Sequence, residues 1–540
     1  MPAAWRIKQA ILAVFLATFV GGISSGTPAR AEAAAFAWQS AYGYALWDAA
    51  RFDLALAEFY RERGFEPIWI TVDGKPSERL DVLYRAIAAA DTHGLDPNAV
   101  GLAELEAIRF DGSARQLAEA EASVSGVYLK FAQIIHAGLV DPSKTSEFIH
   151  LRKRHRIPTG YLMAGVSGGN AAEFVEKLAP QHFQYAELRK ELLRLRRVKE
   201  AGGWGPPAPT VSYSFGMRGP HVLALRDRLV RKGYHKPEFT GVYSMSMANA
   251  VRRLQQDYGL DETGIANWRT LEALNSTVDD QIRQVEVGLE RLRWLSQSFG
   301  PRYVMVNIPE YRARMFDGGQ AVFESTVIVG QAEETHQTPE FSEEIEYLVV
   351  NPIWYVPESI VVDEVIPAMM EDIEAEPDLV FVDTEEMTLI DRRSISFVDP
   401  GLTEKFPYKV VQPPGATNPL GSVKFMFPNR YNIYLHDTPF RDLFGLENRA
   451  HSHGCVRVEK SHDLARMLLG EVGADFDELR SGVEGTFSEE TISLHTPIPV
   501  HITYRTVWAG TDGRIHYRRD IYGRDKSVHD ALLGKVLSSS

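Results

Sequence analysis

The sequence predicts a multidomain α+β protein. Apolar residues recur at helical spacing through most of residues 36–205, and a stretch rich in Gly and Pro follows at 202–214. Near residue 303 the apolar period changes from helical spacing to strict alternation, which is typical of strands. At 540 residues the chain has room for three or four domains of ~150 residues. We therefore expect a mostly helical domain, a small helical module and a β-rich domain, in that order.

The composition excludes several classes of protein. Hydrophobic residues make up 44% and charged residues 24%, values typical of globular proteins rather than disordered or fibrous ones. The net charge of −14 argues against broad binding to nucleic acid or to anionic membranes, which needs a basic surface. Cys455 is the single cysteine, so an intrachain disulfide and a Cys-rich zinc or redox site are both excluded.

The first 31 residues have the pattern of an export signal. Arg6 and Lys8 precede the apolar run 11–20, and small residues lead to Ala31 and Ala33, either of which is a plausible cleavage point. The apolar run is too short to span ~30 Å of hydrocarbon, which disfavours the alternative of an uncleaved membrane anchor. Because exporting compartments oxidise idle thiols, the unpaired Cys455 calls for a functional reason.

The helical first domain, 36–205, carries no catalytic constellation. Leu80, Leu83 and Ile87 mark one amphipathic helix, and apolar residues between Val124 and Ile135 mark another. The scattered histidines of this region lack the spacing of metal ligands. We expect this domain to serve as a scaffold or docking unit.

Residues 213–276 predict a compact bundle of three short helices. Their apolar positions are Val222, Leu225 and Leu229 in the first helix, Val251 and Leu254 in the second, and Leu271 and Leu274 in the third. A linking helix is expected at 280–300.

The β-rich domain is expected at 301–510, with a C-terminal extension at 511–540. Alternation marks strands at 303–308, 321–330 and 347–352, and 317–319 (DGG) is a hairpin signal between the first two. An acidic segment at about 357–415 interrupts this pattern, and we expect it to form a helical lid over the sheet.

A polar face on otherwise apolar strands predicts the active site. Alternation over 431–436 places Asn432, Tyr434 and His436 on one side, and the same alternation pairs Cys455 with Arg457. A thiol with a pKa of ~8.5 must be activated, and a nearby imidazole can take its proton. Gly454 permits a close backbone approach, so the N–H groups of Gly454 and Cys455 are candidates to receive an oxyanion. The side chain of Asp437 should point to the opposite face, which leaves a backbone carbonyl as a candidate to orient the imidazole.

These residues resemble the active-site motif of YkuD-type L,D-transpeptidases. His436 is followed, after fifteen residues, by Ser452-His453-Gly454-Cys455. Supporting similarity lies at 351–357 (NPIWYVP), 418–425 (NPLGSVKF) and 434–439 (YLHDTP). Residues 218–274, with VxxLxxxL, TGxY and AxxxxQxxYGL, resemble the peptidoglycan-binding domain type 1. Matches at 59–60, 67–69 and 93–95 extend the resemblance to the scaffold domain of the large Gram-negative branch.

The resemblance implies a β-sandwich catalytic domain in a periplasmic enzyme that needs no cofactor. Cys455 would be the nucleophile and His436 the base, while His453, Gly454 and Cys455 would form the oxyanion pocket. Attack on the L-centre of diaminopimelate in a tetrapeptide stem would expel D-Ala and leave a thioester. An amine of a neighbouring stem would resolve the thioester as a 3→3 cross-link. A carbapenem would be expected to acylate the same thiol.

Several alternatives remain open from the sequence. His436, His451, His453 and Cys455 could bind zinc or copper, although acyl transfer needs no metal. Arg457 could hold a substrate carboxylate or form a structural ion pair, and Tyr434 and Asn432 could line the substrate pocket. The chain could instead be an inactive wall-binding scaffold, a thiol carboxypeptidase or amidase, or an enzyme that anchors an envelope protein. Expected partners are peptidoglycan and possible cell-wall synthesis proteins, with no nucleic acid and no stable membrane insertion.

Overall fold

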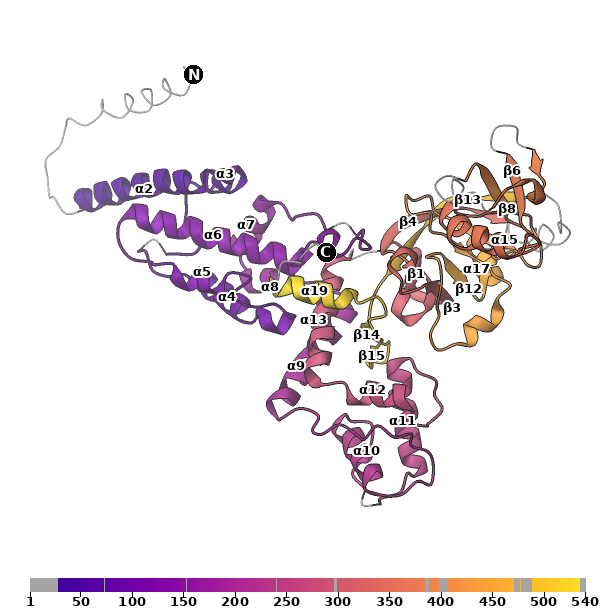
Figure 1. The fold of residues 1–540 in the computed structure, drawn as a ribbon. Helices are drawn as coiled ribbons and strands as arrows, with labels where there is room; N and C mark the ends of the chain where they lie inside the picture. Colours follow the sequence, from indigo (N-terminus) through magenta and orange to yellow (C-terminus); the bar gives the residue numbers. More distant parts are fainter. Residues whose placement is uncertain are drawn as a thin grey trace. The chain divides into compact units, whose positions relative to one another are not determined.

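The structure is a computed structural model that describes residues 28–534 except 72, 152, 239, 296–298, 384–387, 398–405, 471–475 and 477–487 (Figure 1). The predicted export signal thus lies almost entirely outside the described residues. The chain divides into two compact units, the first comprising residues up to Arg85 together with Gly101–Lys130 and Pro158–Phe174. Within the described ranges no helix combines the length and the apolar character needed to cross a membrane.

The first unit is helical, as predicted for this part of the chain. Its helices are α2 (Pro28–Ala50), α3 (Leu54–Glu62), α5 (Leu102–Ala107) and α7 (Thr159–Ser167), while α4 (Glu78–Ala88), α6 (Ala114–Ala137) and α8 (Ala171–Glu176) cross the boundary of the unit. Asp53 begins α3 by accepting a hydrogen bond from the Leu56 N–H. A buried carboxylate, Glu121 on α6, accepts hydrogen bonds from the Tyr60 hydroxyl and the Ile68 N–H and so joins α6 to the segment after α3.

The helices of the second unit include the predicted three-helix module. This module consists of α10 (Pro220–Arg231), α11 (Met245–Tyr258) and α12 (Trp268–Asn275), and the apolar positions predicted for its core are all buried. Ser244 and Asn267 cap the second and third helices, and Gly259 ends α11 at φ 67°. The remaining helical elements before the sheet are η1 (Ala90–His93), η2 (Pro142–Lys144), α9 (Phe183–Glu200) and α13 (Val278–Trp294).

The β-rich domain is built on a sheet of nine strands from the described residues. They are β1 (Arg302–Asn307), β2 (Arg312–Asp317), β3 (Gln320–Gly330), β4 (Phe341–Val350), β9 (Val423–Met426), β10 (Leu435–His436), β11 (Ala450–Ser452), β12 (Val456–Val458) and β13 (Glu490–Thr503). Their order is β11-β3-β12-β10-β9-β4-β13-β1-β2, and an additional β2–β3 pairing closes the sheet on itself. The layers expected from a β-sandwich are therefore hydrogen-bonded into one sheet around one core, which α17 (Ser461–Leu469) joins through Leu464 and Leu468. The hairpin turn predicted at 317–319 is present, but it joins β2 to β3, because the sequence patterns missed the strand β2.

Short elements connect these strands. They are η3 (Ile308–Glu310), η4 (Glu334–His336) and η7 (Arg441–Gly445). The C-terminal segment adds the hairpin β14 (Val507–Ala509) and β15 (Ile515–Tyr517) and ends in α19 (Arg524–Leu532). The predicted multidomain α+β class is thus confirmed.

The inserted segment is only partly the helical lid that the sequence predicts. Helix is present in α14 (Glu358–Ile360), a π-helical turn (Val361–Val365) and α15 (Ile366–Glu371), with a short 3₁₀ turn later at Arg392–Ser394. The segment also contains β6 (Val380–Asp383), β7 (Leu389–Ile390) and β8 (Tyr408–Gln412), which with β5 (Trp354–Tyr355) form a second sheet in the order β5-β8-β6-β7. This sheet and α15 share a separate apolar core that includes Phe381 and Met369. The β-branched pairs at 361–362 and 410–411 occupy helix and strand respectively, so local preference alone does not distinguish them.

Candidate active site

Two short parallel strands bring the candidate residues together. Leu435 of β10 pairs with Val456 of β12, and His436 pairs with Arg457. The Val456 N–H donates to the Tyr434 carbonyl at 3.1 Å. Leu435 and Val456 are fully buried in the core of the closed sheet. Because side chains alternate along a strand, the face away from the core carries Tyr434, His436, Cys455 and Arg457.

Asn432 reaches this face in a way that alternation did not predict. The side-chain oxygen of Asn429 accepts hydrogen bonds from the N–H groups of Tyr431 and Ile433, which holds a turn instead of a continuous strand. Asn432 lies in that turn at φ 55°. Its backbone carbonyl, rather than its side chain, lies 3.6 Å from the Cys455 Sγ. The prediction that Asn432 belongs to a strand is therefore wrong, although the residue does contact the thiol.

The thiol of Cys455 is half-buried and protonated at neutral pH. Burial raises its pKa to about 11, against the lowering effects of a hydrogen bond from Tyr434 and of the Arg457 charge. Burial and the neighbouring Cys455 sulfur likewise hold the pKa of the Tyr434 hydroxyl well above its usual value. Tyr434 therefore remains a hydrogen-bond donor toward the sulfur throughout the physiological range.

The imidazole of His436 is buried, at 3% exposure, and neutral. Burial and the nearby Arg457 charge lower its pKa to about 3. Its Nδ1 lies 2.6 Å from the Asp437 backbone carbonyl, which fixes the ring and favours the proton on Nδ1. The Asp437 side chain points elsewhere and accepts hydrogen bonds from Ser422 and Ser461. The orienting group is thus a backbone carbonyl, the alternative that the sequence left open.

The turn before Cys455 depends on glycine and on a hydroxyl far away in the sequence. Gly454 has φ 111°, a conformation that L side chains rarely adopt. Its carbonyl accepts from the Thr338 Oγ1 at 2.7 Å, and its N–H donates to the Ser452 Oγ at 3.2 Å. The Cys455 N–H makes no hydrogen bond to any described residue. Of the two amides expected to receive an oxyanion, the one at Cys455 is available and the one at Gly454 is engaged.

His453 contacts the insertion. Its Nε2 lies 2.6 Å from Glu364 Oε1 in the π-helical turn, and its ring packs edge-on against His336 with the centroids 4.2 Å apart. Both partners remain partly exposed, at 29% for His453 and 55% for Glu364. Glu364 belongs to the acidic segment at about 357–415, where no local pattern marks it as a partner of His453. The imidazole of His453 therefore joins the nucleophile turn to the inserted segment.

Arg457 forms no ion pair with the residues that the structure describes. Its guanidinium lies over the ring of Phe440, at 5.7 Å from the centroid, and its Nε is buried without a hydrogen-bond partner. Burial lowers the pKa of this group. Of the two roles that the sequence left open, the structure does not support the structural ion pair, and it leaves a cation beside the thiol that can receive a carboxylate.

The histidines of the motif have separate partners. His451 Nε2 is 3.0 Å from the Asn448 carbonyl, whereas His436 and His453 contact Asp437 and Glu364. Across the described ranges no group of three His, Cys, Asp or Glu side chains is arranged to hold a metal ion. Thr338, which sequence reasoning missed, lies 116 residues from Gly454 and carries no local signal of its role.

Three families match successive parts of the chain. Residues 54–192 match the scaffold domain, residues 218–274 the domain described as "Putative peptidoglycan binding domain", and residues 301–502 the L,D-transpeptidase catalytic domain of the YkuD family. The last match contains the closed sheet, the insertion and the motif from His436 to Cys455. Residues 301–502 are therefore similar to the YkuD-type L,D-transpeptidase catalytic domain, and the parts before them to a scaffold domain and a putative peptidoglycan-binding domain.

A curated relative and solved structures carry similar names. A protein of Haemophilus influenzae named "Putative L,D-transpeptidase" is 36% identical over 233 residues, which cover 42% of this chain and 45% of that protein, less than half its length. An L,D-transpeptidase structure from Xylanimonas cellulosilytica is 17% identical, with a TM-score of 0.18 over 55% of this chain and all of that one. One from Stackebrandtia nassauensis is 14% identical, with a TM-score of 0.20 over 55% of this chain and 96% of that one.

Proposed function

We propose that this chain is an L,D-transpeptidase that forms 3→3 cross-links in peptidoglycan through a thioester on Cys455. The observation that carries the proposal is the single thiol of the chain, set with His436 and Arg457 on one polar face of a domain that matches the L,D-transpeptidase catalytic family. The matched peptidoglycan-binding module supports the same substrate.

In the first step the Cys455 Sγ attacks the carbonyl of the donor stem while the Nε2 of His436 accepts the thiol proton. The pKa values of about 11 and about 3 make full proton transfer before attack costly. The opposite directions of the two shifts favour a proton transfer that accompanies carbon–sulfur bond formation. The Cys455 N–H is unpaired among the described residues, which supports its role as a donor to the developing oxyanion.

In the second step the tetrahedral intermediate collapses to the thioester. The carbon–nitrogen bond to D-Ala breaks, and the imidazolium returns its proton to the departing amine. An amine of a neighbouring stem then attacks the thioester, loses its proton to His436 and releases the Cys455 thiol, which is reprotonated. No cofactor enters these steps. The basic, apolar and small-residue pattern of residues 1–31 supports export to the periplasm, where this substrate lies.

A product assay tests the proposal. Purified residues 32–540 are incubated with a disaccharide-tetrapeptide, and the products are weighed by mass spectrometry beside those of Cys455→Ala. The expected product is a dimer with the mass of two tetrapeptides minus one D-Ala, present with the parent chain and absent with the variant. Tripeptide without dimer would instead identify a carboxypeptidase. Unchanged substrate with both proteins would contradict an autonomous enzyme and favour a wall-binding role.

A further inference from the structure

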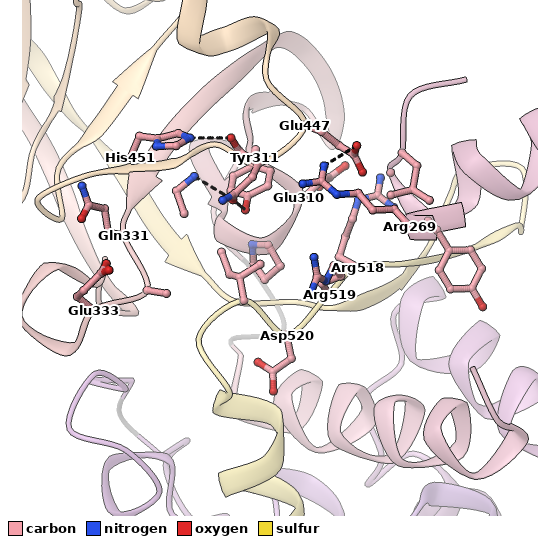
Figure 2. A pocket seen from close by; sticks show the side chains of 18 residues that line it. Arg269, Glu310, Tyr311, Gln331, Glu333, Glu447, His451, Arg518, Arg519 and Asp520 are labelled. Carbon is pink, nitrogen blue, oxygen red and sulfur yellow. Dashed lines mark hydrogen bonds and ion pairs between the residues drawn. The ribbon is translucent and has the colours of Figure 1, made fainter. Parts of the chain in front are cut away.

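A polar pocket lies at the junction of the peptidoglycan-binding module, the catalytic sheet and the C-terminal segment (Figure 2). Its volume is about 600 Å³, enough for several residues of a peptide. Arg269 comes from the module, His451 and Glu333 from the catalytic domain, and Arg518 and Arg519 from the C-terminal segment. The proposed mechanism uses none of these residues.

Some charges that line the pocket are already paired. The two carboxylate oxygens of Glu310 accept from Arg314 at 2.6 and 2.8 Å. Glu447 pairs with Arg269 at 2.6 Å. Asp520 accepts from the Tyr504 hydroxyl and from a backbone N–H. These charged groups line the pocket, but because each already has a partner, they are less able to bind a charged ligand.

Other charges in the pocket remain available, and they lie on opposite sides. Among the described residues Arg518 donates only to the backbone carbonyls of Asp257 and Tyr517, and Arg519 has a loose contact of 3.7 Å with Glu272. The exposed carboxylate of Glu333 forms no ion pair with a described residue. Figure 2 shows the two arginines facing the pocket from one side and Glu333, with Gln331 and His451, from the other.

The position of Arg518 is set by the backbone of the module. Gly259, at the end of α11, has φ 67°, and a Cβ added there would lie 2.4 Å from the Arg518 Cζ. The guanidinium therefore rests where only glycine leaves room for it. Burial lowers the pKa of Arg518 to about 10, and the nearby Glu310 carboxylate offsets part of this effect.

The pocket is continuous with the strand that leads to the nucleophile. The Gln331 N–H donates to the Ser452 carbonyl at 2.9 Å, and β11 contributes Ala450 and His451 to the lining. His451 and Cys455 are four positions apart in the sequence, which is at most about 13 Å of extended chain. A ligand of a few residues can therefore reach from the pocket to the thiol.

Opposed cationic and anionic sides favour a ligand with both signs of charge. We propose that this pocket binds a stem-peptide segment carrying a free carboxylate and a free ammonium group, with the carboxylate against Arg518 and Arg519 and the ammonium against Glu333. Both groups are present at the unreacted centre of diaminopimelate. The identity of the ligand rests on the proposed function, and the role of the site is to hold a stem peptide beside the module while another part of the wall occupies Cys455.

Calorimetric titration of the full chain carrying Cys455→Ala tests this inference without turnover. Three tetrapeptides are compared: one with a free diaminopimelate centre, one with that carboxylate amidated, and one with that amine acetylated. Arg519→Gln is expected to weaken binding of the free peptide about 3- to 10-fold and to leave the amidated peptide nearly unaffected. Glu333→Gln is expected to weaken binding of the free peptide similarly and to leave the acetylated peptide nearly unaffected.

Arg283→Gln and Glu119→Gln serve as matched controls, because each removes a charge from an exposed ion pair that does not line the pocket. Equal losses for all three peptides, or no loss with either pocket variant, would overturn the inference. Failure of the proposed function is distinguishable from this result. Charge-specific binding without dimer in the product assay would support the pocket and contradict the proposed reaction. Normal dimer formation without charge-specific binding would contradict only the proposed pocket.

Discussion

Burial sets the resting protonation of the two central groups at the residue scale. It raises the pKa of the Cys455 thiol and lowers that of His436, so both groups are neutral between about pH 3 and about pH 11. In a preformed thiolate–imidazolium pair, the cysteine would instead be deprotonated and the histidine protonated at neutral pH. This thiol should therefore be a poor nucleophile until a substrate occupies the site.

Alkylation by iodoacetamide should follow this protonation. Because only the thiolate reacts, the rate for the folded chain is expected to be low at pH 7 and to rise about tenfold per pH unit toward pH 11. The urea-unfolded chain should reach its plateau earlier, near the ordinary thiol pKa of ~8.5. Cys455 is the single cysteine, so intact mass reports this site alone, and Cys455→Ala gives the blank. A folded-state plateau below pH 8 would show a preformed thiolate.

Gly454 gives a second prediction at this scale. Replacement by alanine forces a side chain into φ 111° and places a Cβ 3.1 Å from the Ile433 Cδ1. We expect a loss of about 1–3 kcal/mol of stability, measured by urea unfolding, and a drop in dimer formation of about 100-fold as the turn shifts. Gly318→Ala is the matched control, since Gly318 also has positive φ but a Cβ there meets nothing within 4 Å. Equal activity of the two variants would contradict the role of the turn.

At the scale of elements, the contact between Glu364 and His453 connects the insertion to the nucleophile turn. Glu364→Ala should raise amide hydrogen exchange in residues 358–371 by about 2- to 5-fold, because the partly exposed pair contributes at most about 1 kcal/mol. The melting temperature should change by less than about 2 °C. Glu374→Ala removes a carboxylate that pairs with Arg393 inside the same insertion and should leave this exchange unchanged. If both variants behave alike, His453 does not hold the insertion.

Some helices and strands could be predicted from sequence patterns alone, and others could not. The three module helices and the alternating strands β1, β3 and β4 were predictable because each carries its own apolar period and its own end signals. The strands of the insertion were missed because its acidic residues suggested a solvated helix, while the apolar core around Phe381 forms only after β6 and β8 pair. The turn at Asn432 was missed because the Asn429 side chain competes with the strand for backbone donors.

At the scale of the whole molecule, a buried ionic cluster joins the C-terminal helix to the active site. Arg524, 2% exposed, pairs with Glu340 at 3.3 Å and donates to the Thr338 carbonyl at 2.8 Å. Arg291 of α13 pairs with the other oxygen of Glu340 at 2.8 Å. Thr338 in turn holds the Gly454 carbonyl. The C-terminal segment thus supports the nucleophile turn through one intermediate residue.

Arg524→Ala should destabilise the chain by about 3 kcal/mol in urea unfolding, because it leaves Glu340 partly unpaired in the interior. Dimer formation should fall as well, and Arg524→Lys should recover part of both losses by restoring the charge without the forked geometry. Thr338→Val removes the hydroxyl bond to Gly454 and leaves the ion pairs intact. It should lower dimer formation with a smaller loss of stability, about 1–3 kcal/mol. Full activity of Thr338→Val would show that the hydrogen bond from Thr338 to Gly454 does not support the nucleophile turn.

Three features were predictable from the residues alone: the α+β class, the order of helical and β-rich parts, and the motif that contains His436 and Cys455. Those features depend on short-range periodicity and on residue types at fixed spacing, which a sequence displays directly. Three contacts became visible only in the folded chain: the Asp437 carbonyl orients His436, Glu364 contacts His453, and the Thr338 hydroxyl donates to the Gly454 carbonyl. The last two contacts join residues 89 and 116 positions apart. Such contacts arise when separate segments pack on one core, and no local pattern encodes which side chains will then meet.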